Sequence, residues 1–303
     1  MNSANDLISD PTRGDTPAST RWGPERRLEF IDFRLRWDGR LNRGDLIAFF
    51  GISVPQASLD IAKYLELAPG NVAYDRSLRV YVTTPDFKPL YSSNEPARYL
   101  TELLARVTEV LQPELSFIGW APPVAATPNP TRTLSAEVLI ALLGAIRSQT
   151  SVKILYQSMS SPEPKERVIA PHALAYDGFR WHVRAYCTTR ERFLDFVIAR
   201  ILGIQPTQEQ GPGGDADESW HRIIRLVLAP NPLLAKANQR VIELDYGMSD
   251  GEVELECRQA LLFYALKRLG LSNNDNTTSV VQQIVLKNTA EIQQLLPDAT
   301  EPR

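Results

Sequence analysis

The sequence predicts a multidomain α+β protein, because three segments of different patterning follow one another along its 303 residues. The first segment, residues 42–83, reads helix, glycine turn, helix and two short strands, the order of a winged helix-turn-helix. The second, ending near residue 204, consists of strands with alternating side chains. The third, after residue 220, reads β-α-β-α-β, which indicates a small α/β module of ferredoxin-like character.

Segments rich in proline and glycine mark the borders between these parts. The polar N-terminal residues lack the apolar side chains needed for a core, which predicts disorder. The expected parts are a disordered tail (1–20), a winged helix-turn-helix DNA-binding domain (21–92), a helical connector with a Pro-rich linker (93–133), a strand domain with a leading helix (134–204), a linker (205–219) and a C-terminal extension (220–303).

The charge and the cysteines exclude several classes of protein. The net charge is −3, which argues against a uniformly basic coat for nucleic acid but permits a local patch. The excess of acid lies in residues 204–303, which carry nine basic and fourteen acidic residues. Cys187 and Cys257 form neither a ligand spacing nor a disulfide framework, and no apolar run reaches the roughly 20 residues that span a bilayer. We expect a cytoplasmic protein with reduced thiols, no bound metal and no membrane contact.

The helix after Gly51 has the pattern of a recognition helix. Ser53 is a suitable N-cap and Pro55 suits the first turn. A polar stripe of Ser53, Gln56, Asp60 and Lys63 is expected to face a groove, opposite an apolar half formed by Leu59, Ile61, Ala62 and Leu65. An ordinary amphipathic helix would have the same periodicity. The glycine turn and the strands that follow favour recognition.

The two strands within residues 71–83 form a hairpin directly after this helix, which predicts a wing with Arg76 at its tip and Arg79 beside it. Gln can bond adenine, Lys can contact guanine or phosphate, and a small Ala57 can meet a thymine methyl. Asp60 is expected to orient a neighbouring side chain or to accept from cytosine. The candidate DNA-contacting residues are Arg43, Ser53, Pro55, Gln56, Ala57, Ser58, Asp60, Lys63, Arg76 and Arg79.

A second candidate site lies on the strand around residues 179–187. Its apolar face comprises Phe179, Trp181, Val183, Ala185 and Cys187, and its polar face Arg180, His182, Arg184 and Tyr186. A cationic strand face is often simply solvated. Further arginines nearby favour an anion, because the guanidinium fork suits phosphate and carboxylate groups.

This segment resembles the WYL domain. The matching residues are Pro171, Leu174, Gly178, Trp181, Ala185, Tyr186, Cys187, Arg192, Phe193, Arg200 and Ile201, with Trp181-His182-Val183 in place of the Trp-Tyr-Leu triplet. The resemblance implies a small SH3-like β-barrel that senses a ligand and is attached to a bacterial winged-helix regulator. Residues 67–71 and 74–77 are similar to the WYL regulators found with anti-phage systems of the BREX and CBASS type, and the likeness covers roughly residues 26–287.

The resemblance implies a dimeric transcriptional regulator, foremost a repressor of a phage-defence operon, which binds a palindromic operator in double-stranded DNA. Its C-terminal extension would supply dimer contacts, and a ligand of the strand domain would relieve DNA binding. Because a tyrosine can stack on a base and arginines can hold phosphates, we expect this anionic effector to be a nucleotide or oligonucleotide. The candidate effector residues are Tyr156, Ser158, His172, Arg180, His182, Arg184, Tyr186, Arg190, Arg192 and Arg200.

Three alternatives stay open or are disfavoured. The regulator could be an activator, since no residue pattern fixes the sign of regulation. The strand domain could instead be a protein-interaction hub whose arginines pair with acids of the C-terminal module. An enzyme is disfavoured: with three histidines and no Gly-rich phosphate loop, paired-carboxylate site or Ser-His-Asp pattern, we expect no catalytic residues and no cofactor.

Overall fold

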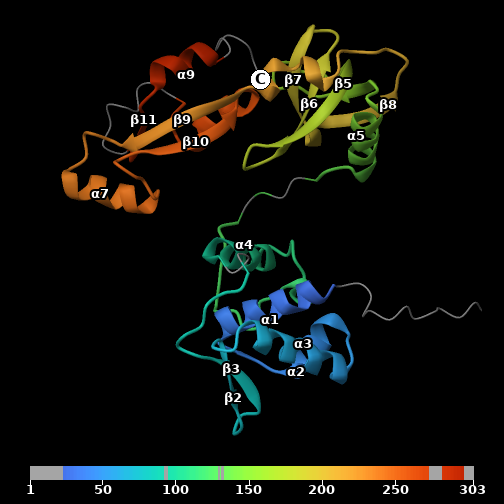
Figure 1. Cartoon of the computed structure of the whole chain (residues 1–303). Coiled ribbons are helices and arrows are strands. Elements are labelled where there is room, and N and C mark those ends of the chain that lie inside the picture. Colours follow the sequence, from blue (N-terminus) through green and yellow to red (C-terminus); the bar gives the residue numbers. More distant parts are fainter. Residues whose placement is uncertain (1–22, 92–94, 129, 131–132, 273–281, 297–303) are drawn as a thin grey trace, which may run out of the picture. The chain divides into compact units, whose positions relative to one another are not determined.

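The computed structural model describes residues 23–91, 95–128, 130, 133–272 and 282–296 (Figure 1). The chain divides into two compact units, residues 1–129 and residues 130–303. The expected disordered tail, residues 1–20, lies outside the described residues.

Unit 1 contains the predicted helix-turn-helix and wing (Figure 1). Its small sheet is antiparallel, with the strand order β1-β3-β2. The expected connector contains the α-helix α4, which ends at Val107. The elements are α1 (Pro24–Asp38), β1 (Arg40–Leu41), α2 (Arg43–Phe50), α3 (Val54–Leu67), β2 (Val72–Asp75), β3 (Val80–Thr83), α4 (Pro96–Val107) and a 3-10 turn (Pro113–Leu115).

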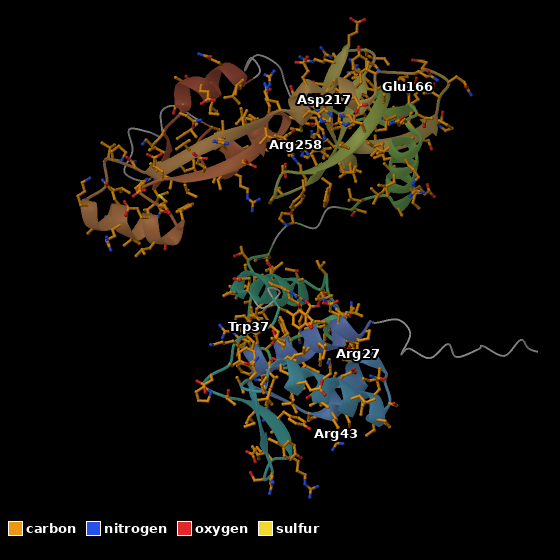
Figure 2. The ribbon with its side chains drawn as sticks, in the orientation of Figure 1. Arg27, Trp37, Arg43, Glu166, Asp217 and Arg258 are labelled. Carbon is orange, nitrogen blue, oxygen red and sulfur yellow. The ribbon has the colours of Figure 1, made fainter. Side chains whose placement is uncertain are left out.

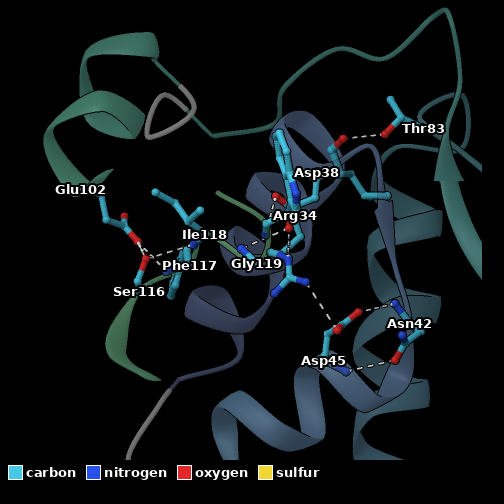
Figure 3. Close-up of polar contacts among 12 residues, drawn as sticks. Arg34, Asp38, Asn42, Asp45, Thr83, Glu102, Ser116, Phe117, Ile118 and Gly119 are labelled. Carbon is cyan, nitrogen blue, oxygen red and sulfur yellow. Dashed lines mark hydrogen bonds and ion pairs between the residues drawn. The ribbon is translucent and has the colours of Figure 1, made fainter. Parts of the chain in front are cut away.

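The turn between α2 and α3 follows from a few local features. Asn42 and Asp45 form a capping box, in which each side chain accepts from the other residue's backbone N–H (Figure 3). Gly51 ends α2 with φ 64°, a left-handed conformation that glycine adopts without strain. The Ser53 hydroxyl then accepts from the Gln56 N–H, and a proline occupies the first turn of α3, as predicted.

Polar contacts attach the rest of unit 1 to α1. Arg34 bridges two carboxylates, lying 2.5 Å from Asp38 and 3.4 Å from Asp45 (Figure 3). The Thr83 hydroxyl donates to the Leu35 carbonyl at 2.5 Å and so joins the end of the wing to the helix. Gly119 lies against Arg34 and Asp38, where a Cβ would come within 2.4 Å of their side chains. The core beneath includes Phe30, Phe33, Leu46, Phe50, Ile61 and Tyr64.

The first part of unit 2 is a five-stranded antiparallel sheet with the order β7-β6-β5-β4-β8. Helix α5 packs against β5 and β8. A 3-10 turn, Ile198–Arg200, connects the two edge strands, β7 and β8. The elements are α5 (Ala136–Ser148), β4 (Val152–Tyr156), β5 (Lys165–Tyr176), β6 (Trp181–Cys187), β7 (Arg192–Val197) and β8 (Ile201–Pro206).

The predicted apolar face of β6 is only partly correct. Val183, Ala185 and Cys187 are fully buried in the core under the sheet. Phe179 and Trp181, in contrast, are about half exposed, because they lie at the turn that joins β5 to β6, beyond this core. There the Trp181 ring packs on Tyr176, with ring centroids 5.0 Å apart.

The C-terminal part of unit 2 has the predicted β-α-β-α-β order, built on an antiparallel sheet with strand order β10-β9-β11. Its core is formed around Leu226, Leu228, Leu262 and Ile292. The elements are a 3-10 turn (Gly214–Ala216), α6 (Glu218–His221), β9 (Ile223–Pro230), α7 (Lys236–Asp245), β10 (Val253–Arg258), a 3-10 turn (Gln259–Leu261), α8 (Leu262–Arg268), β11 (Ile284–Leu286) and α9 (Thr289–Leu295).

Residues 211–221, which we call the strap, lie against the five-stranded sheet. A Cβ on Gly211 would come within 2.9 Å of Ala170, and one on Gly214 within 2.9 Å of His172, both on β5. Asp217 is buried (Figure 2). The glycines that predict a linker here therefore allow the backbone of this segment to pack closely against β5.

Candidate functional site

The outer face of α3 is the first candidate site. Pro55, Ser58, Ala62 and Lys63 point away from the core with at least part of each side chain exposed, and Leu59 is 64% exposed. This face is therefore mixed, with an apolar centre, rather than the purely polar stripe that was predicted. At its edge Arg43 of α2, near the periphery of unit 1 in Figure 2, donates to the Ser58 hydroxyl at 3.3 Å.

Two of the predicted DNA-contacting residues are buried. Ala57 is fully enclosed in the core, so it cannot meet a thymine methyl in this conformation. Asp60 is 5% exposed and accepts from Arg27 of α1 at 2.6 and 3.1 Å and from Gln56 at 3.0 Å. Asp60 therefore orients Gln56 and does not face a groove. Both residues lie on the buried side of α3, and of the two roles expected for Asp60 the structure shows the contact to a neighbouring side chain.

Arg27 is the residue here that sequence reasoning missed. It lies on α1 and is 6% exposed. The sequence does contain one signal for such a partner, since α3 carries a carboxylate directly beside apolar positions. A carboxylate that is buried there requires a cationic or hydrogen-bonding partner from another element.

The wing presents two arginines at an ordered tip. The Asp75 carboxylate accepts from the backbone N–H groups of Ser77 and Leu78 at 2.8 and 3.0 Å and from the Ser77 hydroxyl at 2.6 Å. These hydrogen bonds lower the pKa of Asp75. Arg79 closes the turn with φ 55°, and Arg76 and Arg79 are both exposed.

The second candidate site is a cavity of about 490 Å³ in unit 2. Five arginines and a single carboxylate, Asp195, are among its lining residues, so the cavity favours an anion. Within the described part of the chain, Arg167, Arg190 and Arg200 form no ion pair. The predicted effector residues that line it are Tyr156, Ser158, Arg184, Arg190, Arg192 and Arg200.

The C-terminal module completes this cavity. Gln259, Phe263 and Tyr264 line it, together with residues of α9. The Tyr264 hydroxyl donates to Asp195 at 3.2 Å and so joins α8 to β7. The sequence did not predict that these residues line the site, because no local pattern shows which C-terminal helix packs beside the five-stranded sheet.

Arg184 is held by two carboxylates. Its Nε and Nη2 atoms lie 2.7 and 3.1 Å from the Asp217 oxygens, and its Nη1 lies 3.2 Å from Asp195. His172 Nε2 lies 3.0 Å from the same Asp217 carboxylate. Burial alone would raise the pKa of Asp217, but the hydrogen bonds and charges of His172 and Arg184 outweigh it and hold that pKa well below its usual range. The same carboxylates raise the pKa of Arg184 despite its burial.

The remaining predicted effector residues lie outside the cavity lining. Arg180 and His182 both contact Asp177, at 3.1 and 3.0 Å. Burial would raise the pKa of Asp177, but hydrogen bonds from His182 and from two backbone N–H groups lower it to about 2. His172 faces the strap, and the Tyr186 ring packs on Phe193 with centroids 5.3 Å apart. The structure thus brings six of the ten predicted residues together.

The described residues contain no group of three or more His, Cys, Asp or Glu side chains that could hold a metal ion. No single helix among them is long and apolar enough to cross a membrane, although α2 and α3 together, bent by 118°, have sufficient length and composition.

Comparison with known families gives three matches that run in order along the chain. Residues 23–105 match the BrxR transcriptional regulator winged helix-turn-helix domain, and residues 137–206 match the WYL domain. Residues 223–292 match the BrxR transcriptional regulator C-terminal dimerization domain. The class of protein is therefore a winged-helix regulator with a WYL domain.

Whole-length relatives narrow this class. The DNA-binding transcriptional repressor CapW of Escherichia coli (strain KTE188) is 46% identical over 91% of this chain and 93% of that protein. CapW of Pseudomonas aeruginosa is 46% identical over 95% of this chain and 98% of its own, and CapW of Stenotrophomonas maltophilia 43% identical over 91% and 93%. The chain belongs to the CapW repressor family. These relatives are named as repressors and not as enzymes.

Proposed function

We propose that this protein is a dimeric, sequence-specific DNA-binding transcriptional repressor. The observation that carries the proposal is the exposed face of α3 beside a wing whose tip presents two arginines. Gln56 and Lys63 read base edges, and Leu59 meets a thymine methyl. Arg43, Arg76 and Arg79 contact phosphates, while Ser53, Pro55 and Ser58 line the approach to the backbone. The names of the CapW relatives support this assignment.

The remaining parts of the chain receive roles consistent with a symmetric dimer. The C-terminal extension, residues 220–303, supplies dimer contacts, as the name of its matching family suggests. Two copies of α3 then read a palindromic operator, with half-sites one helical turn or a multiple apart. The strand domain, residues 134–204, is assigned an SH3-like barrel architecture, supported by the edge-to-edge 3-10 connection, and the extension a ferredoxin-like one.

The cavity in unit 2 is the effector site in this proposal. Its arginine-rich lining and the neighbouring rings of Tyr156 and Phe193 suit a nucleotide or oligonucleotide, which carries phosphates and stacking bases. Effector binding relieves operator binding and so induces the regulated operon, for which phage defence is the proposed role. The effector must bind one state of the dimer more tightly than the other to have this effect.

A second candidate function for the strand domain is a structural hub without an effector. The observation that favours it is the engagement of Arg184 by Asp195 and Asp217, since this arginine is already neutralised within the chain. Arg167, Arg190 and Arg200 are not neutralised in this way among the described residues, which favours the effector site. Activation in place of repression leaves the DNA contacts unchanged.

The experiment that tests the proposal is fluorescence anisotropy of labelled duplex from the gene's own upstream region, over a salt series. Specific binding with a dissociation constant of about 10⁻⁸ M is expected, with an affinity that falls steeply as salt rises. A scrambled duplex of the same length is the control. Equal affinity for upstream and scrambled duplex, across tiled upstream fragments, would contradict sequence-specific repression of the gene's own promoter.

A further inference from the structure

Asp217 of the strap occupies the guanidinium fork of Arg184 at the wall of the 490 Å³ cavity. We propose that this carboxylate is an internal substitute for the effector's anionic group, and that the effector binds by displacing Asp217 from Arg184 and releasing the strap. The inference rests on the effector site proposed above and names both its ligand chemistry and its means of transmission. Two oxygens on one centre, as in a phosphate group, fit the same bidentate geometry as the carboxylate.

The displaced contact is a buried one. Asp217 is 2% exposed, and its oxygens accept from Arg184, from His172 and from the Trp220 backbone N–H at 3.2 Å. Arg184 itself is buried, but it is also one of the lining residues of the cavity. A ligand in the cavity therefore has access to the guanidinium that holds Asp217 by a two-point contact. An anion there competes with Asp217 for the same donors.

The strap connects this contact to the C-terminal module. Asp217 caps α6 at its start, and α6 leads directly into β9. Trp220 of α6 lies under the Arg258 guanidinium, 4.7 Å from the ring centroid, and its carbonyl accepts from Arg258 Nη1 at 2.5 Å. The Trp220 ring also packs edge to face with the His172 ring of β5, with ring centroids 5.6 Å apart. Releasing Asp217 thus loosens a segment attached to both the cavity wall and the module matched to the dimerization family.

The charge of the cavity supports a phosphate in place of a neutral ligand. Once Asp217 has left, Arg184 keeps only its single contact to Asp195 among the described residues, and a neutral molecule does not replace the lost charge partner of this buried guanidinium. Arg167, Arg190 and Arg200 line the same cavity and make its electrostatic potential more positive. A multiply charged anion is stabilised by this potential more strongly than the single charge of the Asp217 carboxylate.

The test compares Asp217→Asn with the wild type in the full-length protein, with inorganic pyrophosphate as the probe in isothermal titration calorimetry. The substitution removes the competing charge, so pyrophosphate affinity should rise about tenfold or more. Asp177→Asn is the matched control, because Asp177 also joins a histidine to an arginine at low exposure but lies outside this cavity. Its pyrophosphate affinity should equal that of the wild type.

Amide hydrogen exchange across residues 211–221 gives a second readout that does not depend on the variant's stability. In the wild-type protein, saturating pyrophosphate should increase exchange in the strap while it protects β6 and β7. Arg184→Lys, which cannot form the two-point contact, should show the increased strap exchange without any ligand.

The possible results distinguish the displacement of Asp217 from the existence of an anionic effector site. Pyrophosphate binding to the wild type with no gain in Asp217→Asn, or with a strap that becomes more protected, overturns the displacement while leaving the effector site in place. No pyrophosphate binding to either protein at millimolar concentration overturns both the anionic effector site and the displacement. The operator-binding assay then tests the repressor assignment separately.

Discussion

Arg27 of α1 and Asp60 of α3 form a buried ion pair with an Nε–Oδ2 distance of 2.6 Å, and each side chain is no more than 7% exposed. Because Asp60 also accepts from Gln56, this pair connects the packing of two helices to the side chain proposed to read a base. The pair therefore contributes both to the helix-turn-helix itself and to the position of its reading face.

Arg27→Ala leaves the Asp60 carboxylate buried without its charge partner, so the free energy of opening of α1 and α3 should fall by about 3–5 kcal/mol. The double variant Arg27→Met/Asp60→Leu removes both charges and should recover most of that loss. Amide hydrogen exchange in α1 and α3 measures the effect. Equal protection in the wild type and in Arg27→Ala would show that the pair contributes nothing.

Lys63→Ala and Gln56→Ala should reduce discrimination between the operator and scrambled duplex, by about 1–3 kcal/mol for each lost base contact. Arg76→Ala should instead weaken binding to both duplexes alike and reduce the salt dependence, because a phosphate contact is the same at every sequence. Anisotropy on the two duplexes separates these patterns. Arg147→Ala, an exposed arginine on α5 in the other unit, is the control.

Arg190→Ala and Arg200→Ala should abolish the response of operator binding to the anionic effector while leaving dimers and operator affinity unchanged. The reason is that both arginines line the cavity without an ion pair among the described residues. Light scattering and anisotropy give the two readouts. Loss of the dimer in either variant would favour the hub alternative over the effector site.

The pKa of about 2 at Asp177 predicts a stability difference that depends on pH. A carboxyl whose folded-state pKa is depressed stabilises the fold above its unfolded-state pKa, near 3.9, and loses that contribution as pH falls through the folded value. The free energy of unfolding of the wild type should be larger than that of Asp177→Asn, and this difference should shrink as the pH falls from about 4 to about 2. Urea unfolding at stepped pH values measures this difference, and a constant gap would contradict the assignment.

Gly51→Ala tests the turn of the helix-turn-helix. The φ of 64° at this residue is unfavourable for a side chain, so the variant should lose about 1–2 kcal/mol of stability. Gly144→Ala is the matched control, since Gly144 is an exposed helical position with open space at its Cβ and should tolerate or gain from alanine. Thermal unfolding of both variants provides the comparison.

The elements that depend on local signals were predictable from the sequence. The N-cap at Ser53, the glycine end of α2 and the hairpin after α3 each follow from a few adjacent residues. The inward position of Asp60 was not predictable in this way, because it depends on an arginine 33 residues earlier in the chain.

The cavity shows the same division between local and long-range information. Arginines suited to an anion were evident, but the sequence did not distinguish Arg190 and Arg200, which line the cavity, from Arg180, which contacts Asp177. Pairing of Arg184 with Asp217 joins residues 33 apart, across a segment whose glycines predict a flexible connection. Close backbone packing and flexibility select the same residue type, so composition alone cannot separate them.

The exposed Leu59 at the centre of the α3 face has a consequence for how a promoter would be selected. Contacts to phosphate weaken as counterions accumulate, whereas an apolar contact does not involve counterion release. A regulator that presents leucine to thymine methyl groups would keep much of its discrimination at high ionic strength even as its total affinity declines. It would also be sensitive to deoxyuridine in place of thymidine, a change that removes one carbon from the groove and leaves base pairing intact.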